Sequence, residues 1–455
     1  MKKFFAIFFG TLLLVALAAQ AYAEIKLSGT MRVRGRQGHQ FDLNDRLWLS
    51  GRSGEGQYYD QQVRLQLDAT VSPNLKAFIE IQHEGGDNAT WGITGTGDQS
   101  HQGFQGVQSR YFGALRQAWM LYTGKGLGFT SGLKAGHQLL KLGHGLFYDA
   151  TKYGNDAIVF FMDPTKETHI GLITIKFSES TANVNNDVNG YTALIIHKLD
   201  ANNKIGIDLT QLRGENASRA TTTRKKTDVL NEVGITADGK IAGLTYRADL
   251  QIQSGKGDSN FGNVNGQGSS GWTALSTTEN IKYSAWAYLV GVDYKVDPVT
   301  ITLETAGGSG DDSATNKQKA FQTFLGGDPR YTYVYEFRVG QSGLGAAGTG
   351  AWSPISFGLS NTIYYKIGLA GKATKDLALS GAYYVLRADK AMAITGVSGG
   401  TNRNLGTEFD AKAIYKLAAN LEYGITYGVF KPSNFYDLTP KDTAWSVDHW
   451  IAMKF

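Results

Sequence analysis

The chain has 455 residues, a formal net charge of +5 and no cysteine. The lack of cysteine excludes a disulfide scaffold, a cysteine zinc site and c-type haem attachment. The charge is too near neutral to indicate a nucleic-acid partner. The 57 glycines, 7 prolines and 12% aromatic residues are typical of short strands with aromatic girdles.

The first 23 residues have the three parts of a secretory signal peptide. Lys2 and Lys3 form a basic start, an apolar stretch runs from Phe4 to Ala19, and A-Y-A ends at Ala23. This pattern predicts cleavage after Ala23, with a retained membrane anchor as the alternative. We therefore expect a signal peptide over 1–23 and one structural domain over 24–455.

The strand signal is clearest in G-L-T-Y-R-A-D-L-Q-I-Q, residues 243–253, which alternates between apolar and polar residues. The apolar face holds Leu244, Tyr246, Ala248, Leu250 and Ile252. In a soluble sheet such a face packs on a core. In an outer-membrane barrel it faces lipid, and the polar face lines a lumen. The same alternation recurs at 63–71, 204–210, 284–294 and 421–429.

Taken in chain order, the period-2 segments predict 18 strands. They cover 25–35, 61–71, 75–83, 110–123, 129–140, 154–162, 169–177, 190–199, 204–213, 229–237, 240–253, 280–295, 299–307, 355–372, 377–388, 406–417, 421–430 and 444–455. Residues 331–339 also alternate, but we assign them to a loop. A barrel whose two chain ends both lie on the periplasmic side of the membrane must have an even number of strands. A count of 16 strands is the alternative.

The connections between these strands alternate between short and long. Short turns are predicted at 72–74, 200–203, 238–239, 297–298, 374–376 and 418–420. Long polar connections are predicted at 36–60, 84–109, 141–153, 178–189, 214–228, 254–279, 308–354, 389–405 and 431–443. Outer-membrane barrels have short periplasmic turns and long external loops, so this alternation favours a barrel.

The C-terminal sequence W-S-V-D-H-W-I-A-M-K-F is typical of the last strand of a bacterial outer-membrane barrel. Val447, Ile451, Met453 and Phe455 share one face. A secreted β-sandwich is the alternative, but an apolar edge strand of this kind invites aggregation. We predict an all-β transmembrane antiparallel barrel in the outer membrane of a Gram-negative bacterium. The barrel-assembly machinery would recognise it through Phe455.

Residues 405–435, L-G-T-E-F-D-A-K-A-I-Y-K-L-A-A-N-L-E-Y-G-I-T-Y-G-V-F-K-P-S-N-F, resemble the signature of the alginate-export family of outer-membrane channels. That signature reads Gly-Thr-Glu-x-Asp, then Tyr, an Asn-Leu turn and Gly-x-Phe-x-Pro-Gly; Ser433 replaces its last glycine. L-R-Q-A-W at 115–119, L-K-A-G-H-Q at 133–138 and S-G-D-D at 309–312 also fit. The resemblance spans about 115–455.

This resemblance implies an 18-stranded monomeric barrel. The family's known member exports an anionic polyuronate through an arginine-rich constriction. Arg116 matches the arginine of the Leu-Arg-Gln piece. His137 stands where the family usually has arginine, and histidine is mostly neutral at pH 7. Alternation places His137 on the outward face unless a bulge turns it inward.

Alternation also selects candidate channel-lining residues. They are Arg64, Asp68, Arg116, Lys134, Arg247, Asp249, Lys366, Glu408, Asp410 and Lys412. A ring of cations in a narrow pore favours anions. Alternatively, these charges pair between neighbouring strands and only brace the wall. For Glu408, Asp410 and Lys412, which share one face, we favour a brace near the lumen over a simple salt-bridge network.

We therefore expect a passive channel for a polysaccharide or for small polar or anionic solutes, embedded in outer-membrane lipid. The alternative is a barrel scaffold that sheathes a periplasmic partner, such as a multihaem cytochrome in an electron conduit. A barrel lipase or protease is disfavoured because no nucleophile and base are paired. We expect no cofactor, no catalytic residue and no metal site: His137 and His144 lack ligand spacing, and Asp311 and Asp312 fit a solvated loop.

Overall fold

The computed structural model describes residues 24–39, 56–84, 114–126, 128–178, 188–216, 226–257, 281–311, 317–325, 331–336, 358–391, 402–436 and 441–455. Its strands are β1 (Glu24–His39), β2 (Gly56–Ser72), β3 (Leu75–Glu84), β4 (Ala114–Gly126), β5 (Phe129–Gln138), β6 (Tyr148–Asp149), β7 (Asn155–Asp163), β8 (Thr168–Ser178), β9 (Val188–Lys198), β10 (Lys204–Asn216), β11 (Lys226–Ile241), β12 (Leu244–Gly257), β13 (Ile281–Val296), β14 (Val299–Gly308), β15 (Lys317–Gln318), β16 (Phe324–Leu325), β17 (Ile363–Lys372), β18 (Leu377–Arg387), β19 (Asn404–Ala418), β20 (Leu421–Pro432) and β21 (Ala444–Lys454).

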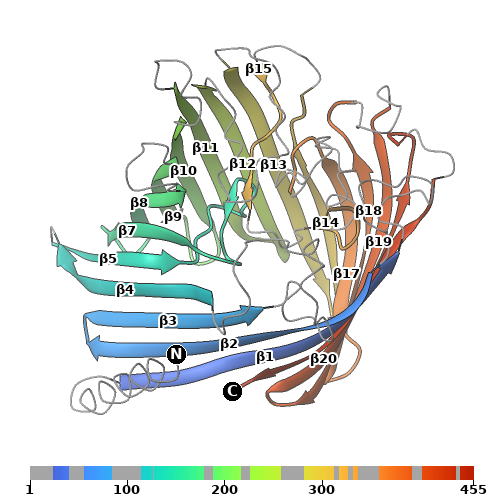
Figure 1. Cartoon of the computed structure of the whole chain (residues 1–455), viewed down its shortest axis with the longest axis horizontal. Helices are drawn as coiled ribbons and strands as arrows, with labels where there is room; N and C mark the ends of the chain where they lie inside the picture. The colour runs from blue at the N-terminus through green and yellow to red at the C-terminus, as the bar shows by residue number, and fades with distance from the viewer. Residues whose placement is uncertain are drawn as a thin grey trace, which may run out of the picture.

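All but three of these strands form a closed antiparallel barrel of 18 strands (Figure 1). Each wall strand pairs with the next along the chain, and β1 pairs with β21 to close the ring. The short strands β6, β15 and β16 lie outside this ring order: β6 pairs in parallel with β16, and β15 pairs in parallel with β13. The predicted fold class and all 18 predicted strands are confirmed, although the strand predicted at 355–372 begins only at Ile363.

The exterior of the wall is apolar and its opposite face is polar, as β12 illustrates. Leu250 and Ile252 are 41% and 48% exposed, whereas Asp249 and Gln251 between them are 2% and 0% exposed. Large apolar side chains are exposed at outward positions on every wall strand, for example Ile79, Ile367 and Tyr423. A lipid-facing exterior accounts for this pattern because lipid, unlike water, solvates apolar side chains.

The seam between the first and last strands depends on a glycine. Gly29 and Phe455 exchange two backbone hydrogen bonds of 2.8 and 3.1 Å. A Cβ atom on residue 29 would lie 2.6 Å from Cζ of the Phe455 ring. The terminal aromatic ring therefore lies over Gly29, where another residue type would displace it.

One predicted turn was misplaced. Asp238 and Gly239 lie within β11, and the strands stay paired as far as Ile241 and Leu244. The turn is formed by Ala242 and Gly243, with φ angles of 49° and 84°. Two positive φ values in a two-residue loop match the twist of a hairpin. Alanine rarely adopts positive φ whereas Asp-Gly is a common turn pair, so the sequence pattern favours residues 238–239 over 242–243.

Several wall strands extend further into the predicted loops than expected. β1 continues to His39 and β2 begins at Gly56, so the predicted loop 36–60 was too long at both ends. Residues 331–336 lie outside the wall, as predicted for 331–339. The signal peptide over 1–23 and most of the loop predicted at 84–109 lie outside the described residues. Within the described ranges, no helix has the length and apolar character needed to cross a bilayer.

The strained turn gives a stability prediction. Replacing Ala242 by glycine should raise the free energy of unfolding by about 0.5–1 kcal/mol, because glycine adopts positive φ without a steric penalty. The matched control is Ala237, which lies in β11, the strand before the turn. Its replacement by glycine should lower the free energy of unfolding by about 0.5–1 kcal/mol. Urea titrations of the barrel in lipid vesicles measure both. Equal destabilisation by the two variants would contradict this account of the turn.

Candidate channel interior

Three segments outside the wall contact its inward side chains. They are residues 139–154 between β5 and β7, residues 317–325, and residues 331–336, the last two between β14 and β17. We call them the interior segments. In Figure 1 the first of them leaves β5 and reaches the region of β12. Their contacts, described next, reach wall strands on several sides of the barrel, which places them inside it.

The first interior segment, 139–154, is held at two points of the wall. From β4, Arg116 donates to the carbonyl oxygens of Thr151 and Lys152 at 2.5 and 2.7 Å. From β12, Asp249 accepts the backbone N–H of His144 at 2.8 Å. Because β4 and β12 lie far apart around the ring, this segment crosses the interior.

An aromatic core joins the first two interior segments. Phe147 and Phe324 contact edge to face with ring centroids 5.4 Å apart, and the backbone N–H of Phe324 donates to the Phe147 carbonyl at 2.7 Å. Tyr148 packs on Phe177 of β8. Gln253 of β12 holds the backbone of Gln322 through two hydrogen bonds of 2.8 and 2.9 Å. The barrel therefore has a packed core within its lumen.

The third interior segment, 331–336, is held by carboxylates of β19. Glu408, which is 1% exposed, accepts the backbone N–H groups of Val334 and Tyr335 at 2.7 and 2.8 Å. Asp410 accepts the N–H of Tyr333 at 3.3 Å. Two neighbouring inward carboxylates thus bind three consecutive amides, and we call this arrangement the β19 latch.

The wall between β1 and β4 carries a series of paired arginines. Arg34 binds Asp60 at 2.6 Å and Arg36 binds Asp448 at 2.9 Å. Arg64 donates to Gln82 at 2.6 Å. Arg116 binds Glu80 at 2.7 Å, and that carboxylate is fully buried. Each ion pair joins neighbouring strands, so the charges brace the wall.

Another charged network crosses β12, β13, β14 and β17. Arg247 binds Asp293 at 2.7 Å and also contacts Glu304, to which its Nε donates at 2.8 Å. Lys366 lies 3.6 Å from Glu304, and Tyr364 donates to the same carboxylate at 2.8 Å. All of these partners belong to the wall.

Opposite the paired arginines, the wall is acidic. Asp208, Glu232 and Asp249 occupy inward positions on β10, β11 and β12, and all three are buried. In the ring order, β11 lies about half-way around the barrel from β2. Within the part of the chain that the structure describes, no group of three or more His, Asp or Glu side chains is arranged to hold a metal ion. The cluster places three buried carboxyl groups on one side of the interior.

The ten residues selected from the sequence occupy different settings. The contacts of seven of them, with side chains of the wall or with the backbone of interior segments, are given above. Of the others, Lys134 lies 4.1 Å from the ring centre of Trp119 and Lys412 lies 5.6 Å from that of Trp450. Asp68 is exposed near the short turn after β2. Lys412 therefore stands apart from the backbone contacts of the β19 latch, although it shares their strand face.

His137 contacts the outward side of the wall. Its Nδ1 lies 2.8 Å from Asp156, whose side chain is 72% exposed, and its Nε2 lies 2.9 Å from the Tyr153 carbonyl. His137, which stands where the family usually has arginine, thus faces the exterior, as strict alternation predicts.

Sequence reasoning missed two of the paired arginines. Arg34 was not selected, and Arg36 was assigned to a loop because the first strand was ended at residue 35. The alternation of R-V-R-G-R at 32–36 could have identified both. The residues that bind the interior segments had no such signal, since their partners are backbone groups far away in the sequence.

Comparisons with known proteins agree with this architecture. The family model described as Alginate export matches residues 113–447. No curated protein matches the chain. The outer membrane protein opdK from Pseudomonas aeruginosa superimposes with a TM-score of 0.56 at 10% identity, covering 95% of this chain and 98% of that chain.

Two further solved structures are similar. A BenF-like porin from Pseudomonas fluorescens Pf-5 gives a TM-score of 0.56 at 11% identity, covering 95% of this chain and 98% of that chain. OpdK from Pseudomonas aeruginosa with vanillate gives 0.53 at 10% identity, covering 94% and 98%. Such identities show the fold alone. The family model matches more than half of this chain, so the chain belongs to the alginate export family.

Proposed function

We propose that the protein is a passive outer-membrane channel for small polar solutes, anionic ones included. The observation that carries this proposal is the set of interior segments packed inside a charge-paired barrel. They reduce the free cross-section, and a narrow polar passage suits small solutes. OpdK, a barrel of this fold, was solved with vanillate, a small carboxylate, and a solute of that size suits a narrow polar passage.

We propose that the channel wall includes the residues selected from the sequence. These are Arg64, Asp68, Arg116, Lys134, Arg247, Asp249, Lys366, Glu408, Asp410 and Lys412. Most of the arginines among the inward side chains have carboxylate partners, as at Arg34, Arg116 and Arg247. A passing anion must compete with those carboxylates, so the passage discriminates weakly between ions.

Export of an anionic polysaccharide is the second candidate, and membership of the alginate export family favours it. Two observations weigh against it. His137 is engaged at the exterior by Asp156, and the arginines of the β1–β4 wall are neutralised by neighbouring carboxylates. A long polyanion needs a continuous track of accessible cations, which such pairs do not supply.

A barrel scaffold around a periplasmic partner needs free space in the lumen. The first interior segment spans from Arg116 to Asp249 and meets the second at Phe147 and Phe324. This packing favours a channel over a sheath. We also propose that the protein is not an enzyme, that it is a monomer, and that the assembly machinery recognises its last strand through Phe455, which is 54% exposed.

Planar-bilayer recordings test the proposed substrate class. Under a salt gradient, we expect stable single-channel conductance with a small reversal potential, because the inward arginines and carboxylates largely neutralise one another. Added polyuronate should leave the current unchanged. Strong anion selectivity with block by polyuronate would contradict the proposal and support polysaccharide export. A folded barrel without conductance would support the scaffold.

The β19 latch gives a second channel prediction. Replacing Glu408 by alanine removes the acceptor for two amides, and a hydrogen bond to a charged group contributes about 1.5–3 kcal/mol. The segment 331–336 should then leave the wall for part of the time. We expect larger conductance with added fluctuation in single-channel recordings.

The matched control is Glu422→Ala. Glu422 is an inward carboxylate of β20 that accepts only a long hydrogen bond of 3.5 Å, from Trp450, among the described residues. Its loss should leave conductance and noise at the level of the unmodified channel. Identical traces for both variants would show that the latch has no part in shaping the passage.

A further inference from the structure

A row of basic side chains crosses the exterior of the barrel at the long-loop ends of β8 to β13. Strand register aligns one residue of each strand from β8 to β13 in a single row. In strand order these are Lys176, Asn189, Arg213, Val229, Lys256 and Lys282. Their chain neighbours Ile175, Leu212 and Tyr283 are buried on the inward face, so the four basic residues face outward. We call Lys176, Arg213, Lys256 and Lys282 the basic row.

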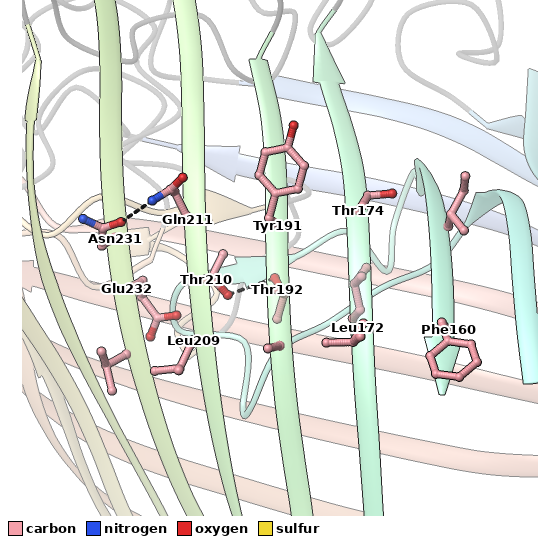
Figure 2. Close-up of a pocket in the computed structure, with 14 residues that line it drawn as sticks. Phe160, Leu172, Thr174, Tyr191, Thr192, Leu209, Thr210, Gln211, Asn231 and Glu232 are labelled. Atoms are coloured by element: carbon pink, nitrogen blue, oxygen red, sulfur yellow. Dashed lines mark hydrogen bonds between the residues drawn. The ribbon is translucent and has the colours of Figure 1, made fainter. Parts of the chain in front are cut away.

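A polar row lies one outward position below it, toward the short turns. Figure 2 shows Thr174, Tyr191, Gln211 and Asn231 side by side on β8, β9, β10 and β11. The side-chain amide of Gln211 donates to Asn231 at 2.9 Å. Hydrogen-bonding side chains on an outward face need a polar environment, because in hydrocarbon their remaining groups go unsatisfied. This row therefore lies at the level of the lipid headgroups.

The polar row and the next outward positions line a mostly apolar groove of about 630 Å³. Leu172, Ala193, Leu209 and Val233 are register neighbours at its base, and Phe160 closes one side (Figure 2). The small side chain of Ala193 lies between two leucines, which leaves a depression in the surface. A groove of this kind, open toward the hydrocarbon and topped by polar groups, fits an acyl chain.

The basic row, the polar row and the groove lie at successive depths in the membrane. Long loops of outer-membrane barrels lie outside the cell, so the basic row faces the headgroups of the outer leaflet. Basic side chains at that height attract anionic lipid headgroups. Neighbouring strands are about 4.8 Å apart, so Lys176 and Arg213, two strands apart, present charges about 10 Å from one another. That spacing suits a headgroup carrying more than one phosphate.

We propose that this face of the barrel binds a phosphate-bearing lipid of the outer leaflet, with its phosphates on the basic row and one acyl chain in the groove beside Ala193. The basic side chains of the row favour an anionic occupant, because Lys and Arg near the membrane surface attract anionic headgroups. The polar row bonds to the sugar of a lipid A headgroup. The site is independent of what passes through the channel.

Native mass spectrometry of the folded barrel in detergent tests the proposal, with bisphosphorylated lipid A as the probe. The triple variant Lys176→Gln, Arg213→Gln, Lys256→Gln should bind it on the order of 100-fold more weakly, at about fivefold for each charge removed. Ala193→Phe, which fills the groove but keeps the charges, should also weaken binding. Heat-modifiable gel migration establishes that each variant is folded.

The control variant is Arg387→Gln, Lys431→Gln. Both residues face outward at the long-loop ends of β18 and β20, away from the groove. It should bind lipid A as the unmodified protein does, and lipid A without phosphates should bind weakly to every variant. Undiminished binding by the triple variant, an equal loss in the control, or equal binding of the dephosphorylated lipid would each overturn the proposal.

Discussion

Carboxylates on the inner wall that accept backbone amides hold the interior of this barrel together. The interior segments are not part of the sheet, so their N–H groups need other acceptors, and a buried amide without one costs about 1–3 kcal/mol. Glu408 and Asp410 supply acceptors for 333–335, and Asp249 supplies one for His144. Together with Arg116 and Gln253, these acceptors fix the interior segments inside the ring.

Lipid imposes the complementary constraint on the exterior. Because outward positions face hydrocarbon, polar side chains must lie inward or near the ends of the strands, and this accounts for the strict period of two in β12. Because of the same constraint, the polar and basic rows at the ends of β8–β13 mark the level of the lipid headgroups. A charged side chain on the outward face is tolerated at the headgroup level, where it can bind an anionic partner.

The sequence predicted the wall well because alternation is a local signal. All 18 wall strands and the family resemblance at 405–435 could be read from neighbouring residues. The errors were also local: Asp238-Gly239 is a better turn pair than Ala242-Gly243, and the first strand was ended before Arg36.

The interior contacts could not be predicted in the same way. Glu408 and Val334 are 74 positions apart, and Asp249 and His144 are 105 apart. The accepting carboxylates look like ordinary inward charges, and their partners are backbone amides that carry no side-chain signature. Alternation selected Glu408, Asp410 and Asp249 as inward residues, and only the folded chain reveals what they bind.

Hydrogen–deuterium exchange of the barrel in lipid nanodiscs measures the central interaction most directly. The peptide that spans 331–336 is expected to exchange as slowly as the strand β19, because Glu408 and Asp410 hold its amides in the interior. In Glu408→Ala the same peptide should exchange at least tenfold faster, while β19 stays protected. Rapid exchange of 331–336 in the unmodified protein would contradict the account.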